Sequence, residues 1–289
     1  MNFDDRFDRS ERLFGKEGQE KLRRACVAVV GVGGVGTHVV QQLALLGVGT
    51  LFLLDHEELS RSNRNRYIGA WHGDRTPGFP KTELGERLVR LIDPTISVRT
   101  VCERFPSRGG LTALREADVV FGCVDDDGAR FVLNEACLAY DKPLFDLASD
   151  VPEPGCYGGR VTVIWRKGGC LHCRQLLDPE EVRRFLSPPE SVENEAAVYG
   201  IDHRLLGEEG PAVVSLNGVV ASLGVTEFMV AATGMRAPYR HLEYRGHMGI
   251  VTRRNDDPSA DCHYCEAVRG QGDAARIERY FTRRESSLI

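Results

Sequence analysis

The chain alternates between short apolar runs and longer stretches in which apolar residues recur at helical spacing. The first run, 26–30, is continuously apolar, as expected of a strand buried on both faces. Glycines within 31–36 then open a segment with an apolar helical face, and Gly47 ends it. A second apolar run follows at 51–54. Residues 26–54 therefore predict a strand, a helix and a second strand, which is a βαβ unit.

The same alternation continues to about residue 150. Helices are expected at 82–91, 111–116 and 130–140, and strands at 97–101, at 119–121 and from 143 onward. A short helical region at 10–24 precedes the first strand. This order of elements predicts an α/β fold with a doubly wound, mostly parallel sheet of the Rossmann type.

Past Pro152 the pattern changes. Residues 160–165 alternate like an exposed antiparallel strand, 178–186 resemble a helix, and 191–210 form a polar loop. The most apolar stretch, 212–230, contains Asn217 and Glu227, so we expect a buried core helix rather than a membrane span. The second half thus predicts an antiparallel extension of the sheet.

Composition and charge exclude several classes of protein. The 289 residues are 42% hydrophobic and 27% charged, which is typical of a globular chain and not of a disordered or coiled-coil one. A net charge of −5 provides no basic field, so no nucleic acid partner is expected. The odd count of nine cysteines and the lack of an apolar segment at the N-terminus favour a reducing cytoplasm over secretion.

The glycine segment carries the first candidate chemistry, through Gly31, Gly33, Gly34 and Gly36. Glycines between a strand and a helix let backbone N–H groups approach a phosphate, and an acid after the next strand can accept hydrogen bonds from ribose hydroxyls. Asp55 lies 19 residues after Gly36 and fits that role. The pattern predicts a nucleotide site, but dinucleotide dehydrogenases share it, and a tight turn without a ligand is the simpler alternative.

A second group of residues narrows the chemistry. Asn63 and Arg66 follow the second strand, Lys81 precedes a helix, and Asp125 follows the strand at 119–121. In a doubly wound sheet these segments meet at the carboxyl edge, where ligands bind. Cations neutralise phosphate charge and an acid holds Mg²⁺, so the group favours phosphoryl chemistry over hydride transfer.

Two C-x-x-C pairs form the third group, Cys170 with Cys173 and Cys262 with Cys265. Four thiolates are the ligand set that Zn²⁺ prefers in a structural site. The 88 residues between the pairs exceed the usual zinc-finger spacing, so redox cysteines and free thiols remain alternatives. The intervening His172 and His263 are expected to face solvent.

Together these residues resemble the MoeB/ThiF/HesA superfamily, which is similar to the ubiquitin-activating enzymes. The resemblance covers residue 6 to about residue 230 and resumes at the C-terminal cysteines. It implies that the glycine loop binds phosphate, Asp55 the ribose and Asp125 Mg²⁺. Asn63 and Arg66 match the family's Asn-x-x-Arg pattern, and Lys81 matches its phosphate lysine. The expected catalytic residues are Arg9, Asn63, Arg66, Lys81 and Asp125. Arg6-Phe7-Asp8-Arg9 is similar to a family segment that implies a homodimer in which Arg9 reaches the partner subunit's nucleotide site.

The resemblance implies an adenylyltransferase. In such an enzyme, ATP with Mg²⁺ adenylates the C-terminal carboxylate of a ubiquitin-like or sulfur-carrier β-grasp protein, and pyrophosphate is released. We therefore interpret 1–150 as the nucleotide-binding region with its N-terminal helical arm. Residues 151–289 are interpreted as the region that binds the carrier protein and holds the Zn²⁺ knuckles, packed on the same sheet. Relatives carry the same paired knuckles, which favours zinc.

The chain also departs from the family. No cysteine lies in the segment of about 186–214, where thioester-forming relatives keep one. A Pro-Ala-Val-Val-Ser-Leu-Asn-Gly run, 211–218, replaces the relatives' Pro-x-x-Gly pattern, and a polar extension follows at 269–289. These features are similar to bacterial relatives associated with conjugating-enzyme-like proteins, which makes such a protein a further candidate partner.

Of the remaining cysteines, Cys26 and Cys137 are expected to be buried packing residues. Cys156, in a glycine-rich loop, is the one free thiol considered as a nucleophile, although an inert loop cysteine is favoured. Three alternatives to a carrier-activating enzyme remain: a tRNA-modifying cyclase of the same superfamily, an NAD-dependent oxidoreductase and a non-catalytic binding scaffold.

Overall fold

The computed structural model describes residues 6–166, 168–187, 211–254 and 258–281. The expected loop at 191–210 lies outside the described residues, as do 282–289 of the C-terminal extension. The strands are β1 Cys26–Val30, β2 Thr50–Leu54, β3 Ser97–Val101, β4 Val119–Gly122, β5 Leu144–Glu153, β6 Cys156–Ile164, β7 His241–Arg245 and β8 Ile250–Arg253.

The longer helices are α1 Asp8–Arg24, α2 Gly34–Leu46, α3 Lys81–Ile92, α4 Arg108–Glu116, α5 Asp127–Ala139, α6 Pro179–Leu186 and α8 Val214–Thr233. Single turns of helix lie at η2 Ser62–Asn65, η3 Gly246–Met248, η4 Tyr264–Val268, η5 Gly272–Ala275 and η6 Ile277–Tyr280.

The eight strands of the described residues belong to one sheet, in the order β3-β2-β1-β4-β5-β6-β7-β8. The pairs from β3 to β5 are parallel, and the pairs from β5 to β8 are antiparallel. The strand order reverses between β1 and β4, the switch point at which doubly wound sheets bind their ligands. The expected fold class, a mostly parallel sheet with an antiparallel extension, is confirmed.

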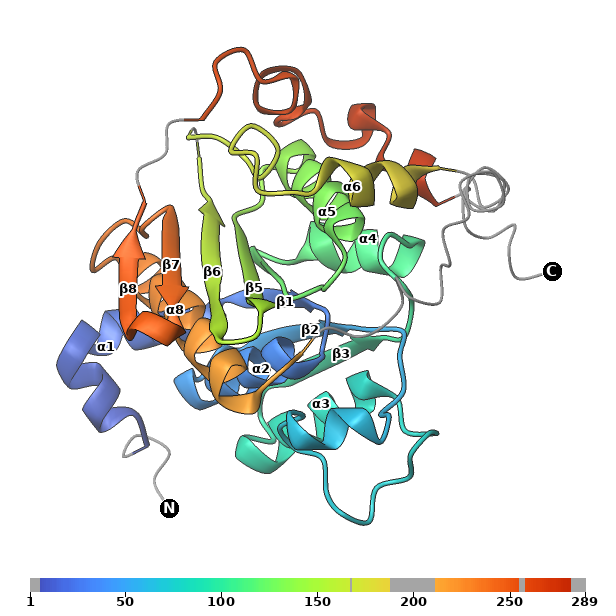
Figure 1. The fold of residues 1–289 in the computed structure, drawn as a ribbon. Coiled ribbons are helices and arrows are strands. Elements are labelled where there is room, and N and C mark those ends of the chain that lie inside the picture. The colour runs from blue at the N-terminus through green and yellow to red at the C-terminus, as the bar shows by residue number, and fades with distance from the viewer. Residues whose placement is uncertain (1–5, 167, 188–210, 255–257, 282–289) are drawn as a thin grey trace.

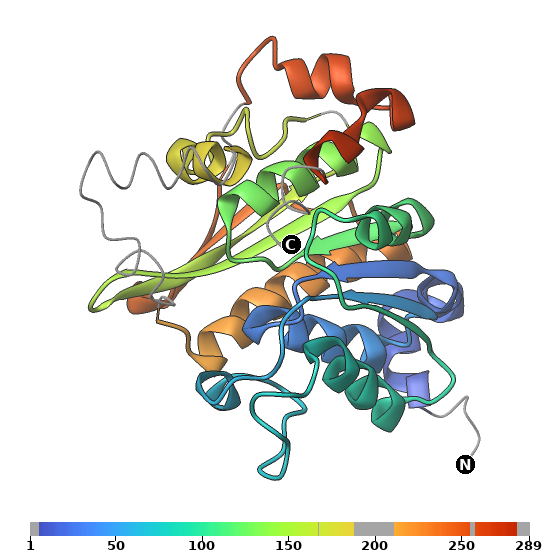
Figure 2. The ribbon, with the colours of Figure 1, turned by 90° about the vertical axis from the view of Figure 1, so that its right-hand side faces the viewer.

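Helices cover both faces of the sheet (Figures 1 and 2). One apolar cluster joins α2, α3 and α8 to the sheet, and a second joins α4, α5 and the cysteine-bearing segments to the opposite face. β1 lies between the two clusters, which explains why its sequence is apolar at every position. The strand β3 stands at the edge of the sheet and is largely exposed.

The long apolar segment forms α8, which packs against α1, α2, β5 and β6. By length and composition it is the one helix in the described chain that could cross a membrane, but half of its most apolar window is buried inside the protein. Leu216, Val220 and Phe228 are among the residues that it buries. The prediction of a core helix is confirmed.

One strand differs from its expected exposure. Residues 160–165 were expected to form an exposed strand, but in β6 the residues Val161 to Ile164 are all buried. Val161 and Val163 pack in the cluster that contains α8, and Ile164 packs in the cluster that contains α5. The prediction of exposure is wrong because helices and loops cover both faces of the sheet here too.

Candidate functional site

A cavity of about 690 Å³ opens at the carboxyl ends of β1, β2, β4 and β5. These ends surround the switch point of the sheet, so the cavity lies where the topology leaves room for a ligand. Among its lining residues are eight that the sequence singled out, namely Gly31, Gly33, Gly34, Asp55, Asn63, Arg66, Lys81 and Asp125.

The glycine loop forms a tight turn from β1 into α2. Gly31 has a φ of +89°, a left-handed conformation that favours glycine, and its N–H donates to the Leu54 carbonyl. A Cβ on Gly36 would lie 2.0 Å from the Gly31 carbonyl oxygen, so Gly36 closes the turn and does not line the cavity. No atom lies within 4 Å of a Cβ built on Gly33, so the middle of the loop faces open space.

Asp55 ends β2 at the edge of the cavity. Its carboxylate accepts hydrogen bonds from the Val32 N–H at 2.8 Å and from the Glu57 N–H at 2.9 Å, which fixes it beside the glycine loop. Burial raises the pKa of Asp55, although Lys81 and these two N–H groups act in the opposite direction. The carboxylate is therefore held in place and still faces the cavity.

The amide and the two cations come from segments beyond β2. Asn63, in η2, is 6% exposed, and its Oδ1 accepts from the Ser60 N–H at 3.1 Å. The Arg66 guanidinium donates to the Ser62 carbonyl at 2.6 Å. Lys81, at the start of α3, is 5% exposed and forms an ion pair with Glu57. Burial opposes ionisation of Glu57, but the hydrogen bond and charge of Lys81 lower its pKa overall.

Asp125 and Arg9 come from parts of the chain other than those that carry Asn63, Arg66 and Lys81. Asp125 lines the cavity after β4 with an exposed side chain. Arg9 lies on α1, is exposed, and does not line the cavity of its own chain. One chain thus brings the predicted nucleotide residues to the cavity except Gly36, which lies within the turn, and Arg9, the residue expected to act across a dimer.

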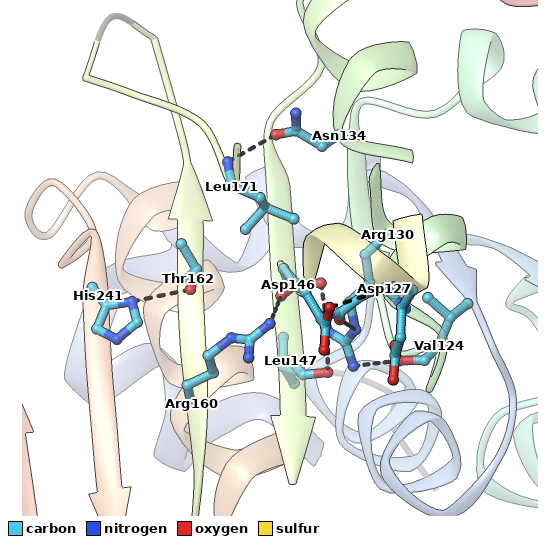
Figure 3. Close-up of polar contacts among 12 residues, drawn as sticks. Val124, Asp127, Arg130, Asn134, Asp146, Leu147, Arg160, Thr162, Leu171 and His241 are labelled. Carbon is cyan, nitrogen blue, oxygen red and sulfur yellow. Dashed lines mark hydrogen bonds and ion pairs between the residues drawn. The ribbon is translucent and has the colours of Figure 1, made fainter. Parts of the chain in front are cut away.

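A buried ionic network next to the cavity was missed from the sequence (Figure 3). Arg130 of α5 donates to Asp146 of β5 at 2.7 Å, and these side chains are 5% and 0% exposed. The same guanidinium donates to the Leu147 carbonyl at 3.2 Å and to the Val124 carbonyl, next to Asp125. Burial opposes its charge, but Asp146 and Asp127 raise the pKa of Arg130 overall. Arg130 thus connects α5 to the loop that carries Asp125.

Arg160 of β6 is the third charged residue of this network, and it lies farther from Asp146 than Arg130 does. Its Nη2 lies 3.7 Å from Asp146, and its Nε and Nη2 have no hydrogen-bond partner in the part of the chain that the structure describes. Burial lowers the pKa of Arg160. The one sequence signal for the network was Asp146 itself, a charged residue within the apolar strand 144–147. Its partners come from elements 14 to 16 residues away, which no local pattern reveals.

The four knuckle cysteines form a compact cluster. Their sulfur atoms all lie within 4.8 Å of one another, and the Cys170–Cys262 and Cys173–Cys265 pairs are each 3.9 Å apart. Tetrahedral Zn–S bonds of about 2.3 Å place sulfurs about 3.8 Å apart, so the donor set fits zinc. His172 and His263 are exposed, as expected. The knuckle is attached to α5 through the Leu171 N–H, which donates to Asn134 at 3.1 Å (Figure 3).

In four of the other cysteines, Cys26, Cys123, Cys137 and Cys156, the pKa of the thiol is raised. Cys137 is buried as expected, whereas Cys26 is only half-buried. Burial raises the pKa of Cys123, which lines the cavity. Cys156 lies outside the cavity lining, and its hydrogen bond to Glu153, at 3.3 Å, raises the pKa of the thiol. A thiol with a raised pKa is a weak nucleophile at neutral pH.

The fold and the cavity define a class, the doubly wound α/β proteins with a glycine loop and a polar ligand site at the carboxyl edge of the sheet. The model of the ThiF family matches residues 7–267. The chain belongs to the ThiF family.

Curated relatives support this assignment. The chain is 29% identical over 257 residues to the adenylyltransferase and sulfurtransferase MOCS3 of Drosophila willistoni, covering 88% of this chain and 51% of that protein. It is 30% identical over 252 residues to the protein of the same name from Culex quinquefasciatus, covering 85% and 53%. The chain spans about half the length of these relatives.

Solved structures share the fold. MccB of E. coli with ATP superposes with a TM-score of 0.68 at 20% identity, covering 90% of this chain and 74% of that one. PaaA superposes with a TM-score of 0.64 at 18% identity, covering 88% and 82%. At these identities the likeness concerns the fold alone.

Proposed function

We propose that this chain uses ATP to adenylate the C-terminal carboxylate of a small ubiquitin-like or sulfur-carrier β-grasp protein. The observation that carries the proposal is the cavity at the switch point, whose lining combines the glycine loop, Asp55, Asn63, Arg66, Lys81 and Asp125. Relatives of this chain are named adenylyltransferases, and one solved structure of the same fold contains ATP.

The cavity residues take complementary parts in holding ATP. Backbone N–H groups of the glycine loop bind phosphate at the N-terminus of α2, and Asp55 accepts hydrogen bonds from the ribose. Arg66 and Lys81 neutralise phosphate charge, and Asn63 donates an amide N–H. Asp125 would hold Mg²⁺, which neutralises the charge of the departing pyrophosphate. When ATP binds, the Lys81 ammonium is shared between Glu57 and phosphate.

The reaction itself needs little from the protein beyond position and charge. A carboxylate oxygen of the carrier protein bonds to the α-phosphorus of ATP, and the bond from that phosphorus to the β-phosphate bridging oxygen breaks. Pyrophosphate leaves with the bonding electrons, and the acyl adenylate remains. No general base is required because the carboxylate is already ionised at neutral pH. Alignment of the two reactants and stabilisation of the charge therefore account for the catalysis.

The rest of the molecule supports this reaction. We assign a structural Zn²⁺ to the four cysteines and a carrier-binding role to residues 151–289. We also propose a homodimer, in which Arg9 of each subunit serves the other subunit's ATP. An exposed Arg9 that lies outside the cavity lining of its own chain agrees with that arrangement. The proposed location is the cytoplasm, and a conjugating-enzyme-like protein is the proposed acceptor of the activated carrier.

ATP–pyrophosphate exchange tests the function directly. The purified chain is incubated with ATP, Mg²⁺ and labelled pyrophosphate, together with each of a panel of β-grasp proteins. We expect label to enter ATP only with a cognate carrier, and Lys81→Ala to abolish the exchange. A carrier truncated by its last residue is the matched control. Binding of NAD in place of ATP would overturn the proposal.

A further inference from the structure

Asn217, on the first turns of α8, was not among the predicted site residues, yet it lies against the glycine loop. Its side chain is buried, with 2% of the residue exposed, and it lines the cavity. A Cβ built on Gly34 would lie 2.3 Å from the Asn217 Nδ2. The amide therefore lies directly over the loop that opens α2.

The orientation of this amide is fixed by Ser149 of β5. The Ser149 hydroxyl donates to the Asn217 Oδ1 at 2.9 Å, so the Nδ2 group is the part that faces Gly34. Within the described residues the Nδ2 group donates no hydrogen bond to the protein. An apolar side chain would suit this apolar helix better, so an amide donor that opens onto the cavity indicates a polar ligand there. A ligand in the cavity would supply the missing acceptor.

The surroundings indicate that this acceptor is an anion. The helix α2 begins at Gly34, and no side chain caps its first turn. Helix N-termini carry partial positive charge and unpaired N–H groups. The Arg66 side chain approaches Gly34 as well, with its Cδ 3.5 Å from the same built Cβ. The N-terminus of α2, the Arg66 side chain and the Asn217 amide donor thus meet at a single glycine.

We propose that Asn217 is a further nucleotide ligand, whose Nδ2 donates a hydrogen bond to a non-bridging phosphate oxygen of the nucleotide held over Gly34. The inference rests on the proposed function, since that function supplies ATP. It also gives a chemical role to the run 211–218, because Asn217 is the polar residue that this run places against the phosphate loop.

Binding measurements with two probes, MgATP and adenosine, test the proposal. Adenosine shares the base and ribose of ATP but has no phosphate. Asn217→Leu should weaken MgATP by about tenfold or more, the loss expected for a hydrogen bond to a charged acceptor, and should leave adenosine affinity unchanged. Asn217→Asp keeps the size and the acceptor for Ser149 but places a negative charge at the phosphate, so it should weaken MgATP more than leucine does.

Ser222→Ala is the matched control. It removes a side-chain hydrogen bond of 3.0 Å between α2 and α8, at an exposed position outside the cavity lining. This variant should bind both probes as the wild type does. If either Asn217 variant binds MgATP as tightly as the wild type, or if MgATP and adenosine weaken equally, Asn217 does not contact phosphate. If the wild type binds adenosine but no MgATP, the proposed function fails, and this inference fails with it.

Discussion

Breaking the buried pair of Arg130 and Asp146 should destabilise the protein strongly. In Asp146→Asn the shape of the side chain is kept but its charge is lost, while the Arg130 guanidinium stays 5% exposed and charged. Removing one member of a buried pair costs about 3–5 kcal/mol. Asp127, 3.4 Å from the Arg130 Nε, still compensates part of the charge, so we expect about 3 kcal/mol.

The assay is thermal unfolding at constant pH and zinc concentration. About 3 kcal/mol corresponds to a fall in Tm of about 6–12 °C for a domain near this size. Glu116→Gln is the matched control, because its pair with Arg99 is equally short, at 2.6 Å, but exposed. That variant should cost less than about 1 kcal/mol.

A double variant separates charge from packing. Asp146→Leu with Arg130→Met replaces the pair by apolar side chains, which should recover part of the lost stability because the Arg130 charge is removed together with its partner and only the less buried Arg160, 25% exposed, loses its nearest carboxylate. If Asp146→Asn lowers Tm no more than Glu116→Gln, the network does not stabilise the fold in the way that its burial implies, and the reasoning is refuted.

Cys170→Ser and Cys265→Ser should each lower bound zinc, measured by atomic emission, together with Tm, since structural zinc contributes directly to folding; unchanged zinc content in the double variant would contradict the assignment. Arg9→Ala and Asp125→Ala should each abolish exchange activity, and mixed subunits should recover about a quarter of it, because random pairing makes about half of the dimers mixed, each with one intact site of two. Subunits that exchange without regaining activity would rule out a role for Arg9 across the interface. Burial lowers the pKa of His38 from its usual 6.5, so the unfolded chain binds a proton that the folded protein resists, and stability should fall as pH drops below about 6.5. His38→Gln should flatten this part of a stability curve measured by urea unfolding, whereas an unchanged slope would assign the effect to other groups.

The elements of the fold were predictable because their signals are local. The apolar run of β1 and the glycine turn after it are each encoded within about ten residues, and the structure reproduces both. Element ends were less accurate: α5 begins at Asp127, three residues before the expected start, because the Asp126 side chain caps it by accepting from the Ala129 N–H.

The residues of the candidate site also differ in whether a local sequence signal reveals them. Gly31, Asp55 and Asp125 follow strands, and topology alone brings strand ends together. The roles of Asn217 and Asp146 depend on partners distant in sequence, which are Ser149 and Arg130 respectively. The pattern of apolar positions therefore shows only that each is a polar residue within an apolar segment. A polar residue that interrupts a buried segment therefore indicates a hydrogen-bonding partner elsewhere in the fold.

The cysteine cluster also changes how the chain is connected. It joins 170–173 to 262–265, so a bound metal ion closes a ring around α6, α8, β7 and β8. A protease that cuts once between Arg174 and Asp261 would therefore yield two fragments that remain tethered through four thiolates as well as through packing. Such a nicked molecule should migrate as one particle until a chelator is added, much as a cleaved disulfide-linked chain stays whole until it is reduced.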